Sequence, residues 1–144
     1  MVSACRSGYC FDVATEFLIH DEGDGWWHCP TPLRAVVIDG PASDGEPPEE
    51  AWFPETFWLV RVEPKIEWHG DTRYAERWGA DHPLCHPIAP TSVALVMASS
   101  RWSGPIDPAR AGGVPVYPVL NDASSVSDAE PVGALGMKVG LSAP

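Results

Sequence analysis

The segment at residues 56–63 constrains the fold more than any other part of the chain, because large apolar side chains alternate along it. A period of two residues is the pattern of a β-strand, whose successive side chains point to opposite faces. This is the clearest strand signal in the sequence. One face of the predicted strand carries Trp58, Val60 and Val62, and the other carries Phe57, Leu59 and Arg61.

Four further segments carry strand signals. Alternation at residues 13–20 and 92–99 predicts two strands, and a β-branched run at residues 33–39, ended by a Gly-Pro pair, predicts a third. Residues 114–120 are apolar but include two prolines. Because proline has no backbone N–H to donate to a sheet, we predict this last segment as an edge strand or an extended arm.

Only one helix is predicted. Asp71 is a suitable N-cap for residues 72–78, and Gly79 is a suitable stop. Since the helices that would connect parallel strands are missing, a parallel α/β sheet is not expected. The sequence therefore predicts an all-β fold, a small antiparallel sandwich or barrel with long Pro/Gly-rich loops, one short helix and an extended C-terminal arm.

The chain of 144 residues has the length of one domain. Its loops are rich in glycine and proline, most clearly at residues 39–54 and 103–113. We predict a single β-rich domain over residues 1–120 and an extended or flexible arm over residues 121–144. Aliphatic residues alternate within that arm at 135, 137, 139 and 141, a pattern suited to adding as a strand to a neighbouring sheet edge.

The formal net charge is −11, from 20 acidic and 9 basic residues. Residues 1–60 account for most of it, since eleven acids and two bases leave −9 there. Direct nucleic-acid binding is not expected, because its affinity comes mainly from Lys and Arg that neutralise phosphates. A membrane role is not expected either, because the charge opposes anionic lipid and no apolar run is long enough to span a bilayer. The acidic half is either a set of solvated loops or a patch that docks a basic partner or a cation.

The N-terminal residues lack the charged and apolar regions of a secretory signal. We therefore expect cytoplasmic synthesis in a reducing environment, where cysteines are more often thiols or metal ligands than disulfides. Incorporation into a particle that later leaves the cell fits equally well.

The cysteines are the candidate metal ligands. Zinc prefers a tetrahedral set of thiolates and imidazoles, and Cys5 and Cys10 flank a short turn of the kind that begins such a site. Their spacing is not the commoner one, so two alternatives to a structural zinc ion stay open: one or two disulfides in an exported particle, or ordinary buried thiols. The candidate ligands are Cys5, Cys10, Cys29 and Cys85, with His28 or His86 as alternates.

A second polar group lies within residues 69–86. It contains the residue types of a hydrolytic metal site and of a thiol–imidazole couple. The spacings of known sites are missing, and prolines near His82 and His86 argue against a regular helix that would present both. The alternative is a polar loop whose histidines cap turns. The members are His69, Asp71, Glu76, Asp81, His82, Cys85 and His86.

Other catalytic templates are absent from the sequence, among them the nucleophile elbow and the phosphate-binding loops. Several tryptophans lie in or beside predicted loops, where they either anchor a partner or cover the core. We therefore favour a non-enzymatic structural or interaction protein that packs through loops and a C-terminal arm onto protein partners in a larger homo- or hetero-oligomeric assembly, for example a virus particle. The alternatives are a metal- or thiol-dependent enzyme using residues 69–86 and a small-molecule-binding β-barrel. The loop tryptophans are Trp26, Trp27, Trp52 and Trp102.

Overall fold

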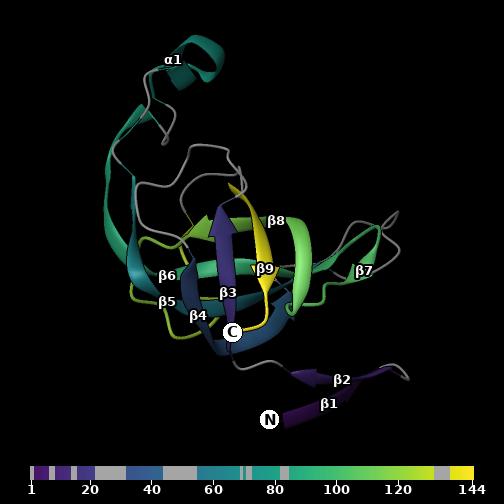
Figure 1. The fold of residues 1–144 in the computed structure, drawn as a ribbon. Coiled ribbons are helices and arrows are strands. Elements are labelled where there is room, and N and C mark those ends of the chain that lie inside the picture. The colour runs from purple at the N-terminus through teal and green to yellow at the C-terminus, as the bar shows by residue number, and fades with distance from the viewer. Residues whose placement is uncertain are drawn as a thin grey trace.

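A computed structural model of the chain describes residues 2–6, 9–13, 16–21, 32–43, 55–68, 70, 73–81, 85–131 and 137–144. Over these residues the protein is all-β, which confirms the predicted class: six antiparallel strands form a closed barrel (Figure 1). Their order is β5-β4-β3-β9-β8-β6, and pairing of β5 with β6 closes the barrel. The short strand β7 adds to β6, and β1 and β2 form a separate hairpin.

The elements are numbered in chain order. They are β1 (Val2–Arg6), β2 (Tyr9–Val13), β3 (Glu16–Asp21), β4 (Leu33–Ser43), β5 (Thr56–Trp68), α1 (Arg73–Trp78), β6 (Ile88–Ser100), β7 (Gly104–Pro105), β8 (Arg110–Pro118) and β9 (Met137–Ser142).

Apolar side chains fill the barrel interior. Trp58, Val60 and Val62 of β5 are buried there together, as the alternation in the sequence predicts. The ring of Phe17 on β3 packs 5.7 Å from the ring of Trp58. Burial of side chains of this size contributes about 1.5–3 kcal/mol each. The interior cluster comprises Phe17, Ile19, Leu33, Ala35, Trp58, Val60, Val62, Ile66, Ala94, Val96, Ala98, Val114, Val116, Val139 and Leu141.

Residues 119–131, here called the covering segment, pack on the outer face of β5 and β6. That face is apolar too, so it needs a cover to exclude water. The backbone N–H of Val126 donates a hydrogen bond of 2.8 Å to Asp39 Oδ2 on β4, and Thr91 Oγ1 donates one of 2.7 Å to the Val119 carbonyl. The second buried cluster, which the covering segment completes, comprises Phe57, Leu59, Val93, Leu95, Val119, Ala123 and Val126.

Strand β4 runs further than the sequence predicts. Instead of ending at the Gly-Pro pair, it continues to Ser43, with irregular register against β5 between Val37 and Ala42. Gly40 lies in this irregular part with φ of 99°, and a Cβ there would collide with the carbonyl oxygen of Phe57. Glycine therefore allows β4 to bulge against β5 and go on as a strand.

Strand β8 contains the two prolines that suggested an edge strand or an arm, yet it lies inside the sheet between β6 and β9. The sheet accommodates them because of where they fall. Pro115 lies just before the pairing with β6 begins at Val116, and Pro118 is the last residue of the strand.

The C-terminal part of the chain differs from the predicted arm. Residues 137–142 form β9, which pairs with β3 on one side and β8 on the other. Val139 and Leu141 are buried in the barrel interior. The aliphatic alternation does mark a strand, but its neighbours belong to the same chain, so the barrel includes residues beyond 120.

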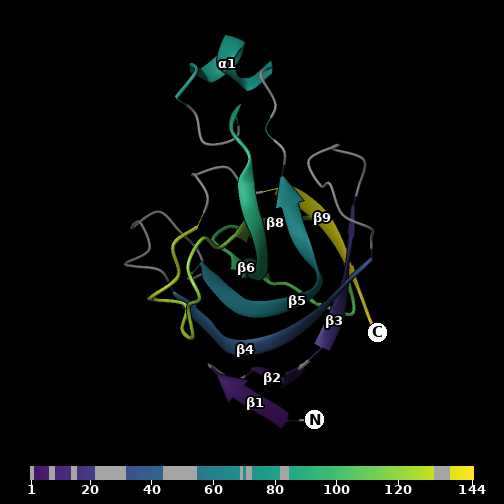
Figure 2. The same cartoon turned by 90° about the vertical axis from the view of Figure 1, so that its left-hand side faces the viewer.

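The α1 end and the β1–β2 hairpin project from opposite ends of the barrel (Figures 1 and 2). β5 and β6 extend beyond it as a long hairpin that carries α1, the single short helix predicted from the sequence. The helix ends at Trp78, and the N–H of the next residue, Gly79, donates to the carbonyl of Ala75 at 3.0 Å. The β1–β2 hairpin lies at the opposite end of the barrel (Figure 2).

Candidate functional site

The barrel wall opens between β6 and β8. These strands pair only where Ala94, Leu95 and Val96 face residues 116–118. Past Val96, β6 continues to Ser100 and pairs with β7, whereas β8 bends away to follow β9. The two strands therefore separate and leave a cleft between them.

A bulge in β8 produces this separation. Ala111 faces Leu141 of β9 and Val114 faces Val139, so β8 has two residues between these positions where β9 has one. One of the two, Gly113, has φ of 63°, a conformation that glycine adopts without strain. Because a bulge bends its strand and increases the local twist, it directs the first half of β8 away from β6.

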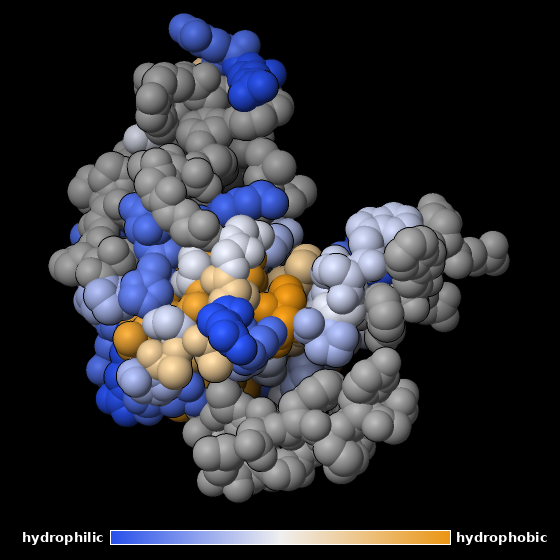
Figure 3. Space-filling model, turned by 45° about the vertical axis from the view of Figure 1, so that its right-hand side comes forward, coloured by the Kyte–Doolittle hydropathy of each residue, from blue (hydrophilic) through white to orange (hydrophobic). Residues whose placement is uncertain are grey.

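The cleft has a volume of about 440 Å³, within the range of ligand pockets. Its apolar lining comes from Met97, Ile106 and Val114. Trp102 lines it from the β6–β7 turn and is 51% exposed, which is high for so large an apolar side chain. The backbone N–H of Trp102 donates to Ser100 Oγ at 3.2 Å, which fixes the turn. On this side of the molecule, apolar side chains reach the surface between hydrophilic ones (Figure 3).

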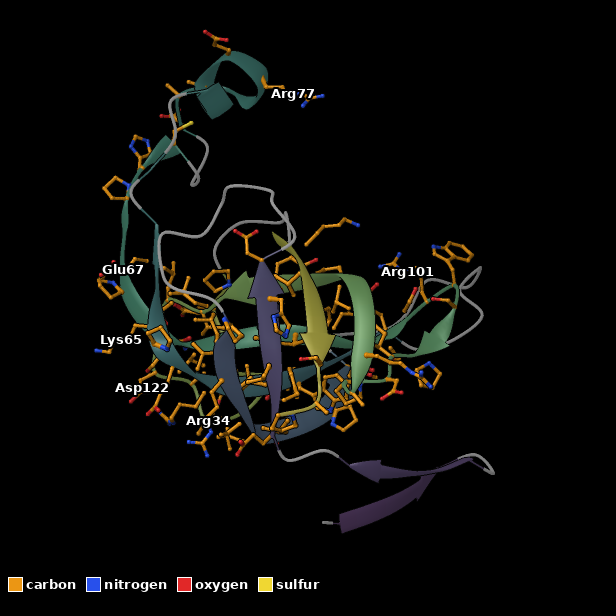
Figure 4. All side chains as sticks on the ribbon, in the orientation of Figure 1. Arg34, Lys65, Glu67, Arg77, Arg101 and Asp122 are labelled. Atoms are coloured by element: carbon orange, nitrogen blue, oxygen red, sulfur yellow. The ribbon has the colours of Figure 1, made fainter. Side chains whose placement is uncertain are left out.

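The cleft is lined by charged side chains of both signs. Among the described residues, Arg101 and Lys138 line it together with one acid, Glu55, although acids outnumber bases about twofold in the whole chain. Arg101 Nε donates to Glu55 Oε2 at 3.0 Å, and this pair is only partly buried. Figure 4 shows Arg101 beside β8 and the β7 hairpin, on the other side of the barrel from Lys65.

Tyr117 lies in the paired part of the seam, opposite Leu95. Its ring meets that of Phe57 edge-on, with centroids 5.9 Å apart. Burial raises the pKa of the phenol above its ordinary value, and the negative charge of Glu55 raises it further, while Arg101 partly opposes this. Tyr117 is therefore neutral at physiological pH and serves as packing next to the cleft.

The predicted metal ligands that the structure describes lie at two ends of the molecule. Cys5 and Cys10 face each other across β1 and β2. Cys85 lies in the connection between α1 and β6, at the opposite end (Figure 1). Cys29 and the alternate His28 lie outside the described residues. The structure does not bring Cys85 together with Cys5 and Cys10, so the zinc site stays a prediction, which zinc analysis with a thiol count would test.

The polar group at residues 69–86 is described in part. Cys85 Sγ donates to the carbonyl of Gly79 at 3.6 Å, and His86 Nε2 donates to the carbonyl of Ala80 at 2.9 Å. These bonds tie the connection back to the end of α1, as a turn-capping role requires. No three His, Cys, Asp or Glu side chains are grouped to hold a metal ion in the described part of the chain. The members outside that part are His69, Asp71 and His82.

Sequence reasoning found one component of the cleft and missed the others. Trp102 was predicted as a loop tryptophan with either an anchoring or a covering role, and it lines the cleft. Arg101 and Lys138 carried no motif, because 36 residues separate them and only the pairing of β9 with β8 brings Lys138 to this side. The one sequence signal for the cleft was Pro115, because β8 is not paired with β6 at this residue.

None of the helices in the described residues has the length and apolar character of a membrane span. No protein family, curated protein or solved structure matches the chain.

Proposed function

We propose that the protein is a non-enzymatic structural or interaction protein, a small β-barrel subunit that binds protein partners in a larger assembly. A subunit of a virus particle, synthesised in the cytosol, is one such setting. The observation that carries the proposal is the contrast between a filled barrel interior and a partly basic, tryptophan-lined cleft on the barrel wall.

The filled interior argues against the alternative of a small-molecule-binding barrel. Binding barrels hold their ligand inside the strands, in a space that side chains leave open. Here the interior positions carry mutually packed side chains such as Trp58, Val60 and Leu33. A ligand would have to displace them, at a cost of several kcal/mol for each large residue.

The polar groups argue for surface chemistry over catalysis. Ser99 is the one buried polar residue of the described part, and its Oγ bonds the backbone N–H and the hydroxyl of Thr56 at 3.1 and 2.7 Å. Of the described members of the 69–86 group, Cys85 and His86 bond backbone carbonyls. Ser99, Cys85 and His86 each have a structural partner, which supports a role in holding the scaffold.

Size-exclusion chromatography with light scattering tests the proposal, on the purified chain and on native extract of the cells that make it. We expect the chain to elute in complexes well above its own mass of 15.6 kDa. A compact 15.6-kDa species in both preparations would contradict a role as an assembly subunit.

A further inference from the structure

We propose that Cys5 and Cys10 form a reversible disulfide across the β1–β2 hairpin, which closes in an oxidising environment and opens in a reducing one. The proposal concerns a modification site, and it does not depend on the proposed function. Two observations carry it: the register of the two strands and the separation of their hairpin from the barrel.

The register of the hairpin places the two cysteines at one cross-strand position. β1 and β2 are antiparallel, and Cys5 of the first strand is the direct partner of Cys10 of the second. The Cα atoms of directly opposed residues in antiparallel strands lie about 4.5 or 5.5 Å apart, according to the kind of pair. Both separations fall within the range of about 4.4–6.8 Å that a disulfide requires. The backbone of the hairpin can therefore accommodate the bond without a change of register.

The register also selects this pair of cysteines over other combinations. Directly opposed residues of paired strands share one face, and a shift of one residue would put the two cysteines on opposite faces. Cys85, the other cysteine in the described part of the chain, lies at the far end of the molecule (Figure 1). Its thiol donates to the Gly79 carbonyl at 3.6 Å. Of the described cysteines, Cys5 and Cys10 are therefore the pair that the fold brings together.

The separation of the hairpin from the barrel gives the bond a physical effect. Among the described elements, β1 and β2 form a sheet of their own, and their hairpin projects from one end of the barrel (Figure 2). A two-stranded hairpin is at best marginally stable in water without a third strand or a packed face. Because a cross-link restricts the open conformations of the chain, a disulfide between the two strands should stabilise their pairing.

The bond forms by thiol–disulfide exchange with a small-molecule disulfide of the class of oxidised glutathione. The thiolate of one cysteine attacks a glutathione sulfur, which forms a mixed disulfide and releases one glutathione thiolate. The thiolate of the other cysteine then attacks the protein sulfur of the mixed disulfide and releases the second glutathione. Two protein thiols are oxidised, one glutathione disulfide is reduced, and the two thiol protons pass to the two released glutathiones.

The test equilibrates the full chain in glutathione buffers, from fully reduced to fully oxidised, and counts its free thiols. The chain has four cysteines, and we expect half of their thiols to disappear, with the loss of two hydrogen atoms in the mass spectrum of the monomer. Cys29→Ser and Cys85→Ser should each keep the bond, whereas Cys10→Ser should abolish it. On oxidation, hydrogen exchange of the β1 and β2 amides should slow by at least about tenfold, and that of the barrel amides should not change.

The matched control moves one thiol by a single residue. The double variant Ala4→Cys with Cys5→Ser keeps the number of cysteines, but it places the moved thiol opposite Phe11, on the other face from Cys10. Its equilibrium constant for oxidation by glutathione should be at least about tenfold lower than that of the wild type. Thermal melts check that each variant folds, and the wild-type thiol count decides the question if the control does not fold.

The proposal is overturned if the wild type keeps all its thiols in the most oxidising buffer, or if the control forms the bond as readily. It is also overturned if the oxidised chain retains glutathione on either cysteine, links to a second chain instead, or holds zinc that protects both thiols. These outcomes are independent of the assembly test. A chain that forms the bond but stays a compact 15.6-kDa species loses its proposed function and keeps this modification site.

Discussion

The two halves of the seam between β6 and β8 use the same two strands in opposite ways. In the closed half, three residues of β6 pair with three of β8, and the covering segment buries the outer face. In the open half, β8 follows β9, and the side chains line a cleft with charged groups. The comparison shows that one strand pair has two roles. Its closed half stabilises the barrel by packing, and its open half leaves side chains accessible at the surface.

The largest expected effect tests packing in the closed half. Leu59→Ala should destabilise the protein by about 2–5 kcal/mol, because it leaves a cavity in the cluster below the covering segment. Leu59 is fully buried, whereas Leu120, at the start of the covering segment, is 60% exposed. Leu120→Ala should therefore change stability by less than about 0.5 kcal/mol. Urea unfolding followed by tryptophan fluorescence measures both, and equal losses would show that the covering segment does not bury this face in solution.

The next effect tests the hydrogen bond between Asp39 and the covering segment. Asp39→Ala removes the acceptor for the Val126 N–H and should cost about 1–3 kcal/mol. Asp39→Asn keeps an oxygen acceptor without the charge and should cost less. Hydrogen exchange of the Val126 amide should accelerate in the alanine variant. Unchanged exchange would mean that packing alone holds the covering segment.

A smaller effect concerns Tyr117, which lies in the closed half and is influenced by the charges of Glu55 and Arg101 in the open half. Burial, the largest cause, and Glu55 raise the pKa of its phenol in the folded state. Because the folded pKa is the higher one, this group contributes stability below the unfolded pKa, and the contribution is lost as pH rises through the folded pKa. Subtracting the alkaline titration curve of Tyr117→Phe from that of the wild type isolates the titration of Tyr117. We expect its midpoint to lie above the ordinary pKa of tyrosine, and Glu55→Gln to lower that midpoint partway. If Glu55→Gln leaves the midpoint unchanged, the charge of Glu55 in the open half does not influence Tyr117.

Features that depend on neighbouring residues could be predicted from the sequence, whereas features that depend on residues far apart in the chain could not. The alternation of Trp58, Val60 and Val62 is a local signal, because every second residue of a strand faces the core. It predicts the burial of these three residues correctly. Barrel closure through β9 depends on strands more than 100 residues apart in the chain, as the register of His20 and Gly140 illustrates. No local pattern distinguishes such a strand from a tail.

The cleft was less predictable than the fold for the same reason. It forms where strands separate, so its residues share a place in space but no spacing in the sequence. The bond from Val126 to Asp39 spans 87 positions, and the covering segment that it holds has no periodicity of its own. Trp102 could be identified from the sequence because a large apolar side chain beside a Gly/Pro-rich loop is unusual in itself. Its identification did not require knowledge of the residues that lie near it in the fold.

The smallest effect on stability is expected for an exposed ion pair on the far side of the barrel. It serves as the control for the stability changes in the two halves of the seam. Arg34 Nη2 donates to Glu16 Oε2 at 2.9 Å between β4 and β3, and both side chains are open to solvent. The hydrogen bond from Arg34 lowers the pKa of Glu16 below its ordinary value, so the contribution of this pair is present above the unfolded pKa and lost as pH falls through the folded one. Arg34→Ala should return the pKa of Glu16 toward 4.5, as carboxyl NMR titration would show, and leave the melting temperature at neutral pH almost unchanged. A loss as large as that of Leu59→Ala would mean that an exposed ion pair, and not the packing of the closed half, dominates the stability of the barrel.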